Sequence, residues 1–219
     1  MCGRYVSPET AAIERQWQVA RRSGELFPVR FNVSPSMPVP VLWREGEALV
    51  LGAARWGFVP HWWKEAKPPR FSHNARIEEA ATKPMWRDAM RGAGLQAGGA
   101  RCLVPAQGWY EWRESDHQPF YLHRADGRLA ALAGLLCPLP DGGGMSCAIL
   151  TGPAHGTLAT VHDRMPILLS GEQERAWLDR HFPGETAREE RGAILFHPVP
   201  RLVNSSRAEG PQLIEPLAA

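Results

Sequence analysis

The feature that most constrains the fold of this chain is a series of short apolar runs rich in residues that favour β-strands. Each run is shorter than a typical helix and is bounded by turn residues, a pattern that predicts strands. Turns rich in Gly, Pro and Asp separate the runs, and the chain holds 21 Gly and 20 Pro among its 219 residues. The runs lie at residues 39–43, 48–56, 101–106, 119–124, 129–136, 147–150 and 194–199.

Three other segments have the features of helices. Ser7 and Pro8 fit an N-cap and a first helical position, and apolar residues then recur at helical spacing up to Gly24. A second helix is expected over residues 84–91. A third begins at a capping-box sequence, residues 170–173, and is expected to end at the Pro-Gly pair 183–184.

The order of these segments indicates the fold class. Because the strands do not alternate regularly with helices, a parallel doubly wound fold is disfavoured. The sequence instead predicts an α+β protein with one domain over residues 1–219, built on a curved, mostly antiparallel, barrel-like sheet with flanking helices. Residues from about 209 to 219 are expected to form a tail. The hydrophobic fraction of 44% argues against intrinsic disorder.

The overall charge excludes few partners. The chain has 25 Lys and Arg against 23 Asp and Glu, a net charge of +2 that by itself does not indicate DNA binding. The charge is uneven, however: residues 55–91 hold eight basic and four acidic side chains, whereas residues 172–190 hold three and six. The first segment is therefore a small basic region that is able to grip a few phosphates.

No apolar run approaches the roughly 20 residues of a membrane-spanning helix. No signal peptide is recognised at the N-terminus, so we expect a cytoplasmic protein, which would associate with the nucleoid if it binds DNA. Histidines and cysteines lack the spacing of metal ligands, and neither a metal nor a cofactor is expected. Cys102, Cys137 and Cys147 lie in apolar strand-like stretches and are expected to be buried.

Cys2 differs from the other cysteines because of its position. Removal of Met1, which a small second residue permits, leaves an α-amine with a pKa of about 8 beside a thiol with a pKa of about 8.5. An aldehyde can condense with the amine to a Schiff base, to which the thiol then adds to close a thiazolidine ring. The residue could also attack an amide or ester. Alternatively, Cys2 merely follows the initiator methionine.

Glu111 lies among three aromatic residues. Strand alternation puts Trp109 and Glu111 on one face and Tyr110 and Trp112 on the other. A carboxyl group among apolar rings is expected to have a raised pKa, which suits proton transfer near neutral pH. The alternative is a glutamate at a sheet edge with its carboxylate in water.

Two further segments carry polar residues that could take part in chemistry. Asn74 and Arg76 follow a basic and aromatic stretch, residues 62–71, and an amide can orient an amine while Arg can pair with phosphate. His162 is a natural proton carrier near neutral pH, and Arg164 is another candidate for binding phosphate. The structural alternatives are that the first segment is a surface loop and that His162 is a loop residue hydrogen-bonded to the backbone.

These segments, in this order, resemble the SOS response-associated peptidase (SRAP) family, the abasic-site processing proteins. The resemblance covers about residues 2–205 of the chain, and the combination of its motifs is specific although no single motif is. Ile-Glu-Glu after the Asn-Ala-Arg motif and the doubled Trp at 62–63 depart from the family pattern without touching the expected chemistry. The matching sequences are MCGRY at 1–5, FNVSP at 31–35, ARWGFVP at 54–60, NAR at 74–76, RCLVP at 101–105, GWYEW at 108–112, AGL at 133–135 and HDRMP at 162–166.

The resemblance implies that the protein crosslinks covalently to abasic sites in single-stranded DNA. Cys2 would attack the aldehyde of the ring-opened deoxyribose, and Asn74 would position the Cys2 amine and the sugar. Glu111 would shuttle protons, and His162 would assist proton transfer or bind the adjacent phosphate. Lyase activity and autocatalytic removal of Met1 are further options.

The same resemblance assigns a set of DNA contacts. Arginines would hold phosphates beside the lesion, and aromatic residues would stack on neighbouring bases or wedge between them. The expected partner is single-stranded DNA that contains abasic sites, bound by a monomer. The expected DNA-binding residues are Arg4, Asn32, Pro35, Trp62, Trp63, Phe71, Arg76 and Arg164.

Two other functions remain as alternatives from the residues themselves. One is a thiol peptidase or amidase that uses Cys2, Glu111 and His162. The other is a non-catalytic module that binds single-stranded DNA and in which Cys2 is incidental. Reactivity toward an aldehyde separates the crosslinking protein from the peptidase.

Overall fold

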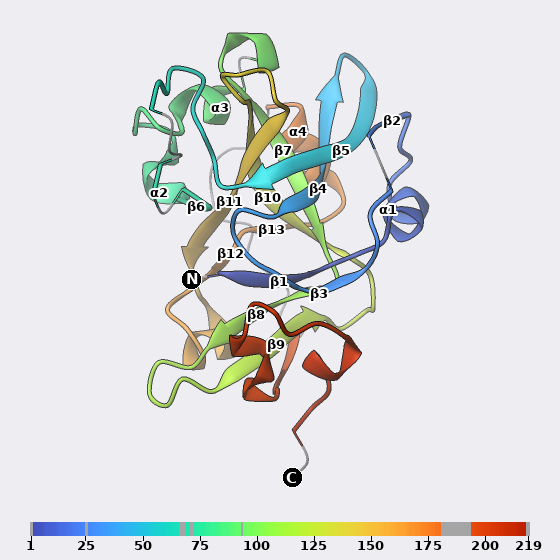
Figure 1. The fold of residues 1–219 in the computed structure, drawn as a ribbon, viewed down its shortest axis with the longest axis vertical. Coiled ribbons are helices and arrows are strands. Elements are labelled where there is room, and N and C mark those ends of the chain that lie inside the picture. The colour runs from blue at the N-terminus through green and yellow to red at the C-terminus, as the bar shows by residue number, and fades with distance from the viewer. Residues whose placement is uncertain are drawn as a thin grey trace.

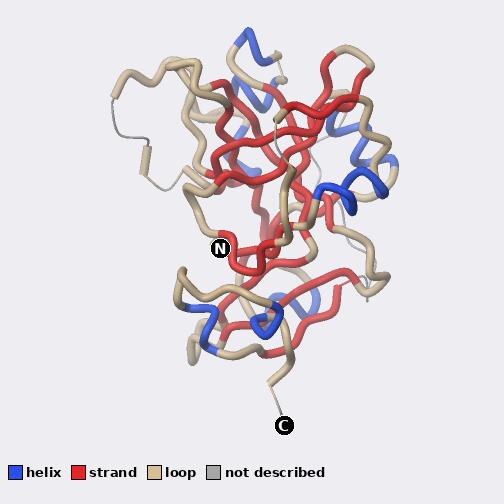
Figure 2. Tube along the Cα trace, turned by 45° about the vertical axis from the view of Figure 1, so that its right-hand side comes forward, coloured by secondary structure: helices blue, strands red, loops and turns tan. Residues whose placement is uncertain are grey.

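The computed structural model describes residues 2–24, 26–65, 69–70, 72–92, 94–180 and 194–217. These residues form two sheets, the larger in the upper half of Figure 1 and the smaller in the lower half. The amino terminus lies between the two sheets in both ribbon views (Figure 1 and Figure 2). The start of the chain is therefore placed where the two halves of the molecule meet.

The larger sheet has nine strands in the described part of the chain and curls into a ring. Its main path runs β12, β11, β10, β7, β4, β5, β2, with β13 beside β10 and β6 beside β11. A parallel pairing of β5 with β11, in which Arg55 lies opposite Ser146, closes the path. Its strands are β2 (Arg21–Ser23), β4 (Pro38–Glu45), β5 (Ala48–Trp56), β6 (Asn74–Arg76), β7 (Ala100–Ala106), β10 (Ala130–Pro138), β11 (Met145–Pro153), β12 (Arg164–Pro166) and β13 (Leu168–Leu169).

The smaller sheet is antiparallel and has the strand order β14, β9, β8, β1, β3. Gly108 at the start of β8 allows a close approach to β9, because a Cβ there would lie 2.3 Å from the carbonyl oxygen of Leu122. Its strands are β1 (Arg4–Ser7), β3 (Arg30–Val33), β8 (Gly108–Trp112), β9 (Pro119–Arg124) and β14 (Ile194–Pro198).

Helices are short and flank the sheets, which confirms the expected α+β class with a curved, mostly antiparallel sheet (Figure 2). The α-helices are α1 (Thr10–Gln16), α2 (Ile77–Ala80), α3 (Arg87–Arg91) and α4 (Glu172–Leu178). The 3-10 turns are η1 (Leu95–Ala97), η2 (Gly156–Thr160), η3 (Arg201–Asn204) and η4 (Pro211–Leu213).

The apolar side chains gather in three clusters. One surrounds Cys2 and Trp109, a second lies beneath α1, α3 and α4, and a third includes Tyr110 of the smaller sheet. Trp109 and Tyr110 thus point to opposite faces of β8, as strand alternation predicts. The expectation that the three later cysteines are buried is confirmed, since each is fully inaccessible to solvent: Cys102, Cys137 and Cys147.

The first expected helix is wrong in its second half. α1 ends at Gln16, and the segment Arg21–Ser23 forms β2 instead of continuing toward Gly24. β2 pairs in parallel with β5, with Arg21 opposite Val50, so its backbone groups bond to a neighbouring strand. Pairing with the sheet overrides the local helical pattern here. Ser7 likewise belongs to β1, and Glu9 is the residue before the helix.

The other two helices are confirmed, with shorter bounds. α3 is followed by Gly92 in a left-handed conformation (φ 66°), the usual geometry at a helix end. At α4 the backbone N–H of Ser170 donates to the Gln173 side chain at 3.2 Å, which is half of the expected capping box, and Gly171 occupies the N-cap. α4 ends at Leu178, so the expected end at residues 183–184, which lie outside the described residues, is wrong.

The segment expected to form a tail packs on the smaller sheet up to the last described residue. Leu213 is fully buried in the third apolar cluster, and the backbone N–H of Phe31 on β3 donates to the Glu209 carboxylate. The backbone N–H of Leu217 donates to the carbonyl oxygen of Pro198 at 3.0 Å. Residues 209–217 therefore belong to the folded structure.

Candidate active site

Cys2 lies immediately before β1 and is fully buried. It packs in the same apolar cluster as Tyr5, Trp56 and Trp109. Burial raises the pKa of the Cys2 thiol well above its ordinary value, and the negative charge of Glu111 raises it further. The thiol is therefore protonated near neutral pH.

Asn74 holds the backbone of Cys2. It lies on β6, a three-residue strand that adds to β11 in parallel with Asn74 opposite Ile149. Its side-chain Nδ2 donates to the carbonyl oxygen of Cys2 at 2.7 Å, while its Oδ1 is buried and has no hydrogen-bond partner within the described ranges. Asn74 is 9% exposed. Residues 72 positions apart in sequence thus meet through one buried hydrogen bond.

Glu111 comes to the same place on β8. This strand pairs with β1, with Arg4 opposite Tyr110, so the residue after Tyr110 lies beside the start of the chain. Glu111 is 2% exposed, and burial raises the pKa of its carboxyl group to about 8. The expected raised pKa is thereby confirmed, and the alternative of a carboxylate in water is wrong. Such a group exchanges protons readily near neutral pH.

His162 lies in the turn after η2, near Glu111. Both residues line a cleft of about 260 Å³ that also includes Asp163. The backbone N–H of Arg164 donates to Nδ1 of His162 at 3.0 Å, and Oδ1 of Asp163 lies 2.7 Å from the same nitrogen. Burial lowers the pKa of His162. The structure therefore brings Glu111 and His162 together in one cleft, and it links Glu111 and Asn74 to the buried Cys2.

Arg4 and Asn32 are engaged inside the protein. Nη1 of Arg4 donates to Oδ1 of Asn32 at 2.7 Å and to the carbonyl oxygen of Val203 at 2.9 Å. Asn32 is 2% exposed, and its Nδ2 donates to the carbonyl oxygens of Ser205 and Ala208. These bonds tie the segment around η3 to β1 and β3. Asn32 is placed as an internal tie, and its role in DNA binding stays a prediction.

Arg76 and Arg164 differ in their surroundings. Arg76 ends β6 and is exposed, whereas the Arg164 side chain is only 12% exposed. The Arg164 guanidinium donates to both carboxylate oxygens of Glu78, at 3.0 and 2.9 Å, and to the carbonyl oxygen of Thr151 at 2.8 Å. A phosphate beside Arg164 would therefore share this guanidinium with Glu78.

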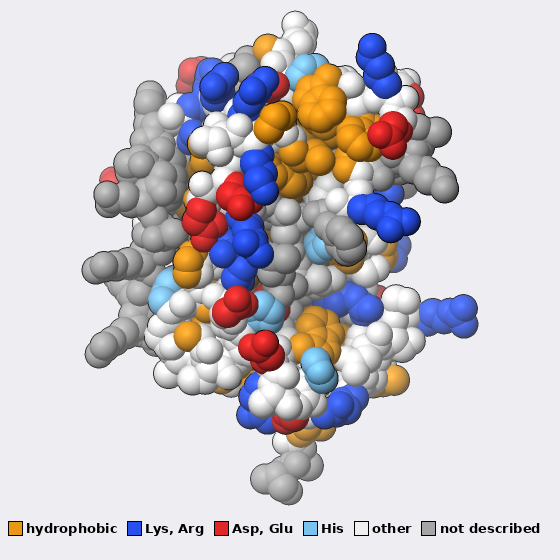
Figure 3. Space-filling view, turned by 90° about the vertical axis from the view of Figure 1, so that its left-hand side faces the viewer, with side chains coloured by type: hydrophobic (Ala, Val, Ile, Leu, Met, Phe, Trp, Pro, Cys, Tyr) orange, Lys and Arg blue, Asp and Glu red, His pale blue; other side chains and the backbone are white. Residues whose placement is uncertain are grey.

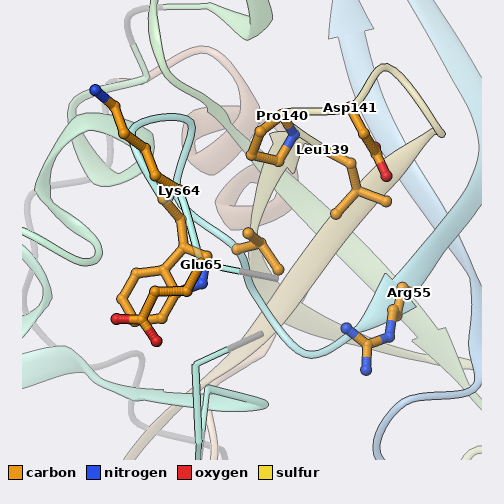
Figure 4. Close-up of a pocket in the computed structure, with 8 residues that line it drawn as sticks. Arg55, Lys64, Glu65, Leu139, Pro140 and Asp141 are labelled. Atoms are coloured by element: carbon orange, nitrogen blue, oxygen red, sulfur yellow. The ribbon is translucent and has the colours of Figure 1, made fainter. Parts of the chain in front are cut away.

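The paired tryptophans lie on the loop after β5. Trp62 is 43% exposed, Trp63 is partly buried, and their ring centroids are 6.0 Å apart. Trp63 lines a hollow of about 680 Å³ together with Arg55 and Lys64. Figure 4 shows that Arg55 comes from β5 and Lys64 from the loop on the opposite side. Pro35 is partly buried in the turn after β3, and Phe71 lies outside the described residues.

Figure 3 shows the face of the molecule on which the amino terminus lies in Figure 1. Exposed hydrophobic side chains gather in its upper part, and Lys and Arg side chains lie beside them, interspersed with Asp and Glu. The face is therefore mixed in charge rather than uniformly basic.

Sequence reasoning missed two polar residues at the site, Glu78 and Thr151. Glu78 is the partner of Arg164, and the charge of nearby Arg76 also lowers its pKa, after the larger effect of the Arg164 hydrogen bond. Thr151 lies on β11 opposite Arg76, and its fully buried hydroxyl has no hydrogen-bond partner in the described part of the chain. A polar residue directly after the apolar run 147–150 was the available signal for Thr151.

Across the described ranges, no group of three or more His, Cys, Asp and Glu side chains is placed to hold a metal ion. The helices in these ranges also include none that is long and apolar enough to cross a membrane.

Solved structures share this fold. A protein from Bordetella bronchiseptica superposes with a TM-score of 0.73 at 22% identity, over 91% of this chain and 100% of that one. A phage-related protein from the same organism gives a TM-score of 0.67 at 28% identity, over 90% and 94% of the two chains.

Sequence comparison identifies relatives that match over nearly the whole chain. The abasic site processing protein YedK of Escherichia coli is 34% identical over 99% of this chain and 100% of its own length. YoqW of Bacillus subtilis, which bears the same description, is 31% identical over 98% and 99% of the two chains. The profile of the family described as SOS response associated peptidase (SRAP) matches residues 1–206. The chain therefore belongs to the SRAP family.

Proposed function

We propose that this protein recognises abasic sites in single-stranded DNA and binds them covalently through Cys2 after removal of Met1. Its relatives from Escherichia coli and Bacillus subtilis are named abasic site processing proteins, which supports a role in the response to DNA damage. The observation that carries the proposal is the arrangement around Cys2: its carbonyl oxygen accepts a bond from Asn74, and its thiol lies within the field of Glu111.

The proposed crosslink forms in two steps between Cys2 and the sugar. The α-amine of Cys2 adds to the C1′ aldehyde of the ring-opened sugar, and loss of one water gives an imine. The thiol sulfur then adds to the imine carbon while its proton passes to the imine nitrogen, which closes a thiazolidine ring. The amine and thiol belong to one residue, so the second step is intramolecular and is favoured by proximity.

The proton transfers are assigned to Glu111 and His162. Opening the sugar requires a proton donor at the ring oxygen and a base at the hydroxyl, and imine formation requires acid help to release water. With a pKa of about 8, Glu111 is mostly protonated near neutral pH and serves as the acid. Burial lowers the pKa of His162, so its neutral imidazole is available as the base or as a donor to phosphate.

DNA contacts are assigned to residues around this centre. Arg4, Arg76 and Arg164 hold phosphates beside the lesion, and the aromatic side chains stack on neighbouring bases. The exposure of Arg76 and Trp62 supports this assignment. The proposed aromatic contacts are Trp62, Trp63 and Phe71, and Asn32 and Pro35 complete the proposed set of DNA-binding residues.

The burial of Cys2 favours this function over a thiol peptidase. A peptidase nucleophile of this kind acts as a thiolate and therefore needs a lowered thiol pKa. Burial and the charge of Glu111 both raise the pKa of the Cys2 thiol. A reaction that begins with the amine and adds the thiol in a later step does not require the free thiolate.

The test is incubation of the purified protein with a single-stranded oligonucleotide that carries one abasic site. We expect a slower band on a denaturing gel without borohydride, and an N-terminal peptide whose mass equals peptide plus sugar fragment minus one water. An oligonucleotide with every base intact and the variant Cys2→Ala are the controls. Equal shifts for wild type and Cys2→Ala would refute the thiazolidine, and no shift for wild type would refute the crosslink.

A further inference from the structure

A second group of cationic side chains lies far from the proposed crosslinking centre. A cavity of about 500 Å³ opens between the end of α4, the residues after α3 and the start of β7, and Arg44, Arg101 and Arg180 all line it. Figure 1 places α3 and α4 in the upper half of the molecule and β8, which carries Glu111, in the lower half. This cavity shares no lining residue with the cleft of Glu111 and His162.

Arg101 is held rigidly at the start of β7. Its Nε donates to the carbonyl oxygen of Met90 at 2.9 Å, and its guanidinium carbon lies 4.5 Å from the centre of the Trp177 ring. Its Nη1 is buried and has no hydrogen-bond partner within the described ranges. A buried guanidinium donor without an acceptor is unfavourable.

Arg180 reaches the same cavity from the end of α4. Its Nη1 donates to the carbonyl oxygen of Gly92 at 2.8 Å. The absence of a side chain at Gly92 makes room for this contact, because a Cβ there would lie 2.7 Å from Cδ of Arg180. The glycine is also required by its φ of 66°. Both arginines are thus positioned by fixed backbone groups.

The charges of these arginines are unequally compensated. Arg44 forms an ion pair with Asp179 at 3.1 Å, but neither Arg101 nor Arg180 has a carboxylate partner within the described ranges. Burial lowers the pKa of Arg101, and the positive charge of Arg180 lowers it further, so the two cations lie close enough to repel. The cavity's own carboxylates, Asp179 and Glu47, leave it one positive charge in excess.

We propose that this cavity binds a phosphate-type oxyanion between Arg101 and Arg180. The negative charge of an oxyanion relieves the repulsion between the two guanidiniums, and its oxygens accept hydrogen bonds from guanidinium N–H groups that line the cavity. The planar guanidinium groups match phosphate oxygens in geometry. The oxyanion is the phosphate of a small molecule or of a nucleic-acid backbone, and both present the same chemistry to the cavity.

The experiment measures phosphate binding in the Cys2→Ala background, so that crosslinking plays no part. Inorganic phosphate is titrated at constant ionic strength against chloride, and the rise in Tm gives an apparent affinity by mass action. The variants are Arg101→Gln and Arg180→Gln, and the matched control is Arg22→Gln on the exposed strand β2. General salt effects on stability act on all of these proteins alike.

We expect a saturable rise in Tm for the parent and for Arg22→Gln, and an apparent affinity lower by about tenfold or more in the other two variants. Arg180→Gln is informative even if Arg101→Gln folds poorly. Equal responses in all proteins, or no saturation, would overturn the site. Affinity for an unmodified oligonucleotide then identifies the source: a parallel loss in Arg180→Gln indicates backbone phosphate, and unchanged DNA affinity indicates a small phosphate compound.

Discussion

Two glutamates of the candidate active site have opposite electrostatic settings: Glu111 lies in its interior, and Glu78 lies on a rim formed with Arg76 and Arg164. Glu111 on β8 is 2% exposed, and burial raises its pKa to about 8. Glu78 on α2 has a side chain that is 44% exposed, and its hydrogen bonds from Arg164 lower its pKa. The two glutamates differ because the loss of water has the largest effect on the pKa of Glu111, whereas Glu78 keeps its water and accepts hydrogen bonds from an arginine.

This difference in pKa suits the two regions to two different kinds of chemistry. A carboxyl group with a pKa near the working pH can give and take protons, which suits the interior around Cys2. An ionised carboxylate paired with arginine controls charge, which suits the phosphate contacts proposed for the rim. Substitutions in the interior should therefore change the chemical step, and substitutions on the rim should change DNA binding and its dependence on salt.

The largest expected effect comes from the interior substitution Cys2→Ser. The amine remains and can form an imine, but the hydroxyl is a poorer nucleophile than the thiol and does not close a lasting ring. We expect no band on a denaturing gel without borohydride and a band when borohydride is present. A borohydride-independent band as strong as that of wild type would show that the sulfur is not needed.

Glu111→Gln should reduce the rate of crosslinking by a factor of about 10² to 10⁴, the usual contribution of a general acid–base group. Affinity for unmodified single-stranded DNA should stay unchanged, because Glu111 is buried. The rate is measured by quenching the reaction over time on a denaturing gel. Glu114→Gln is the matched control, since Glu114 lines the same cleft but is exposed. Equal rates in the two variants would remove Glu111 from the mechanism.

The same substitution should change the dependence of stability on pH. Folding raises the pKa of Glu111 from 4.5 to about 8, so the folded state binds a proton that the unfolded state has lost. The free energy of unfolding should therefore fall as the pH rises from about 4.5 to 8, by up to a few kcal/mol, and level off above 8. Glu111→Gln should lack this fall in urea unfolding between pH 5 and 8.5. Parallel curves for wild type and Glu111→Gln would contradict the raised pKa.

The smallest expected effect lies on the rim. Arg76→Ala should weaken binding of unmodified single-stranded DNA a few-fold and make the slope of log K against log salt shallower by about 0.7, the value for one phosphate contact. Fluorescence anisotropy at several salt concentrations measures both quantities. Arg22→Ala, an exposed arginine on β2 paired with Glu14, should leave the slope unchanged. A slope in Arg76→Ala equal to that of wild type would contradict a phosphate contact.

Local sequence patterns were most reliable where a strand is apolar and bounded by turns. The expected strands 48–56 and 119–124 coincide with β5 and β9, because their apolar runs and flanking turns specify both ends. Short strands escaped detection, since three residues carry too little pattern. β6 is the important example: the sequence singled out Asn74, but its pairing with β11 depends on a strand more than 70 residues away.

Local sequence patterns indicate the fold class and the burial of the three later cysteines, and the resemblance to the SRAP family adds the residues expected to act with Cys2. These features follow from local composition, from strand periodicity and from motifs whose residue types fit the chemistry. Three features became visible only in the tertiary structure. β2 replaces the end of the first helix, Asn32 donates a hydrogen bond to the segment after η3, and the Arg164 guanidinium donates to Glu78. The physical reason is that each of these outcomes depends on a hydrogen bond or ion pair between residues distant in the chain.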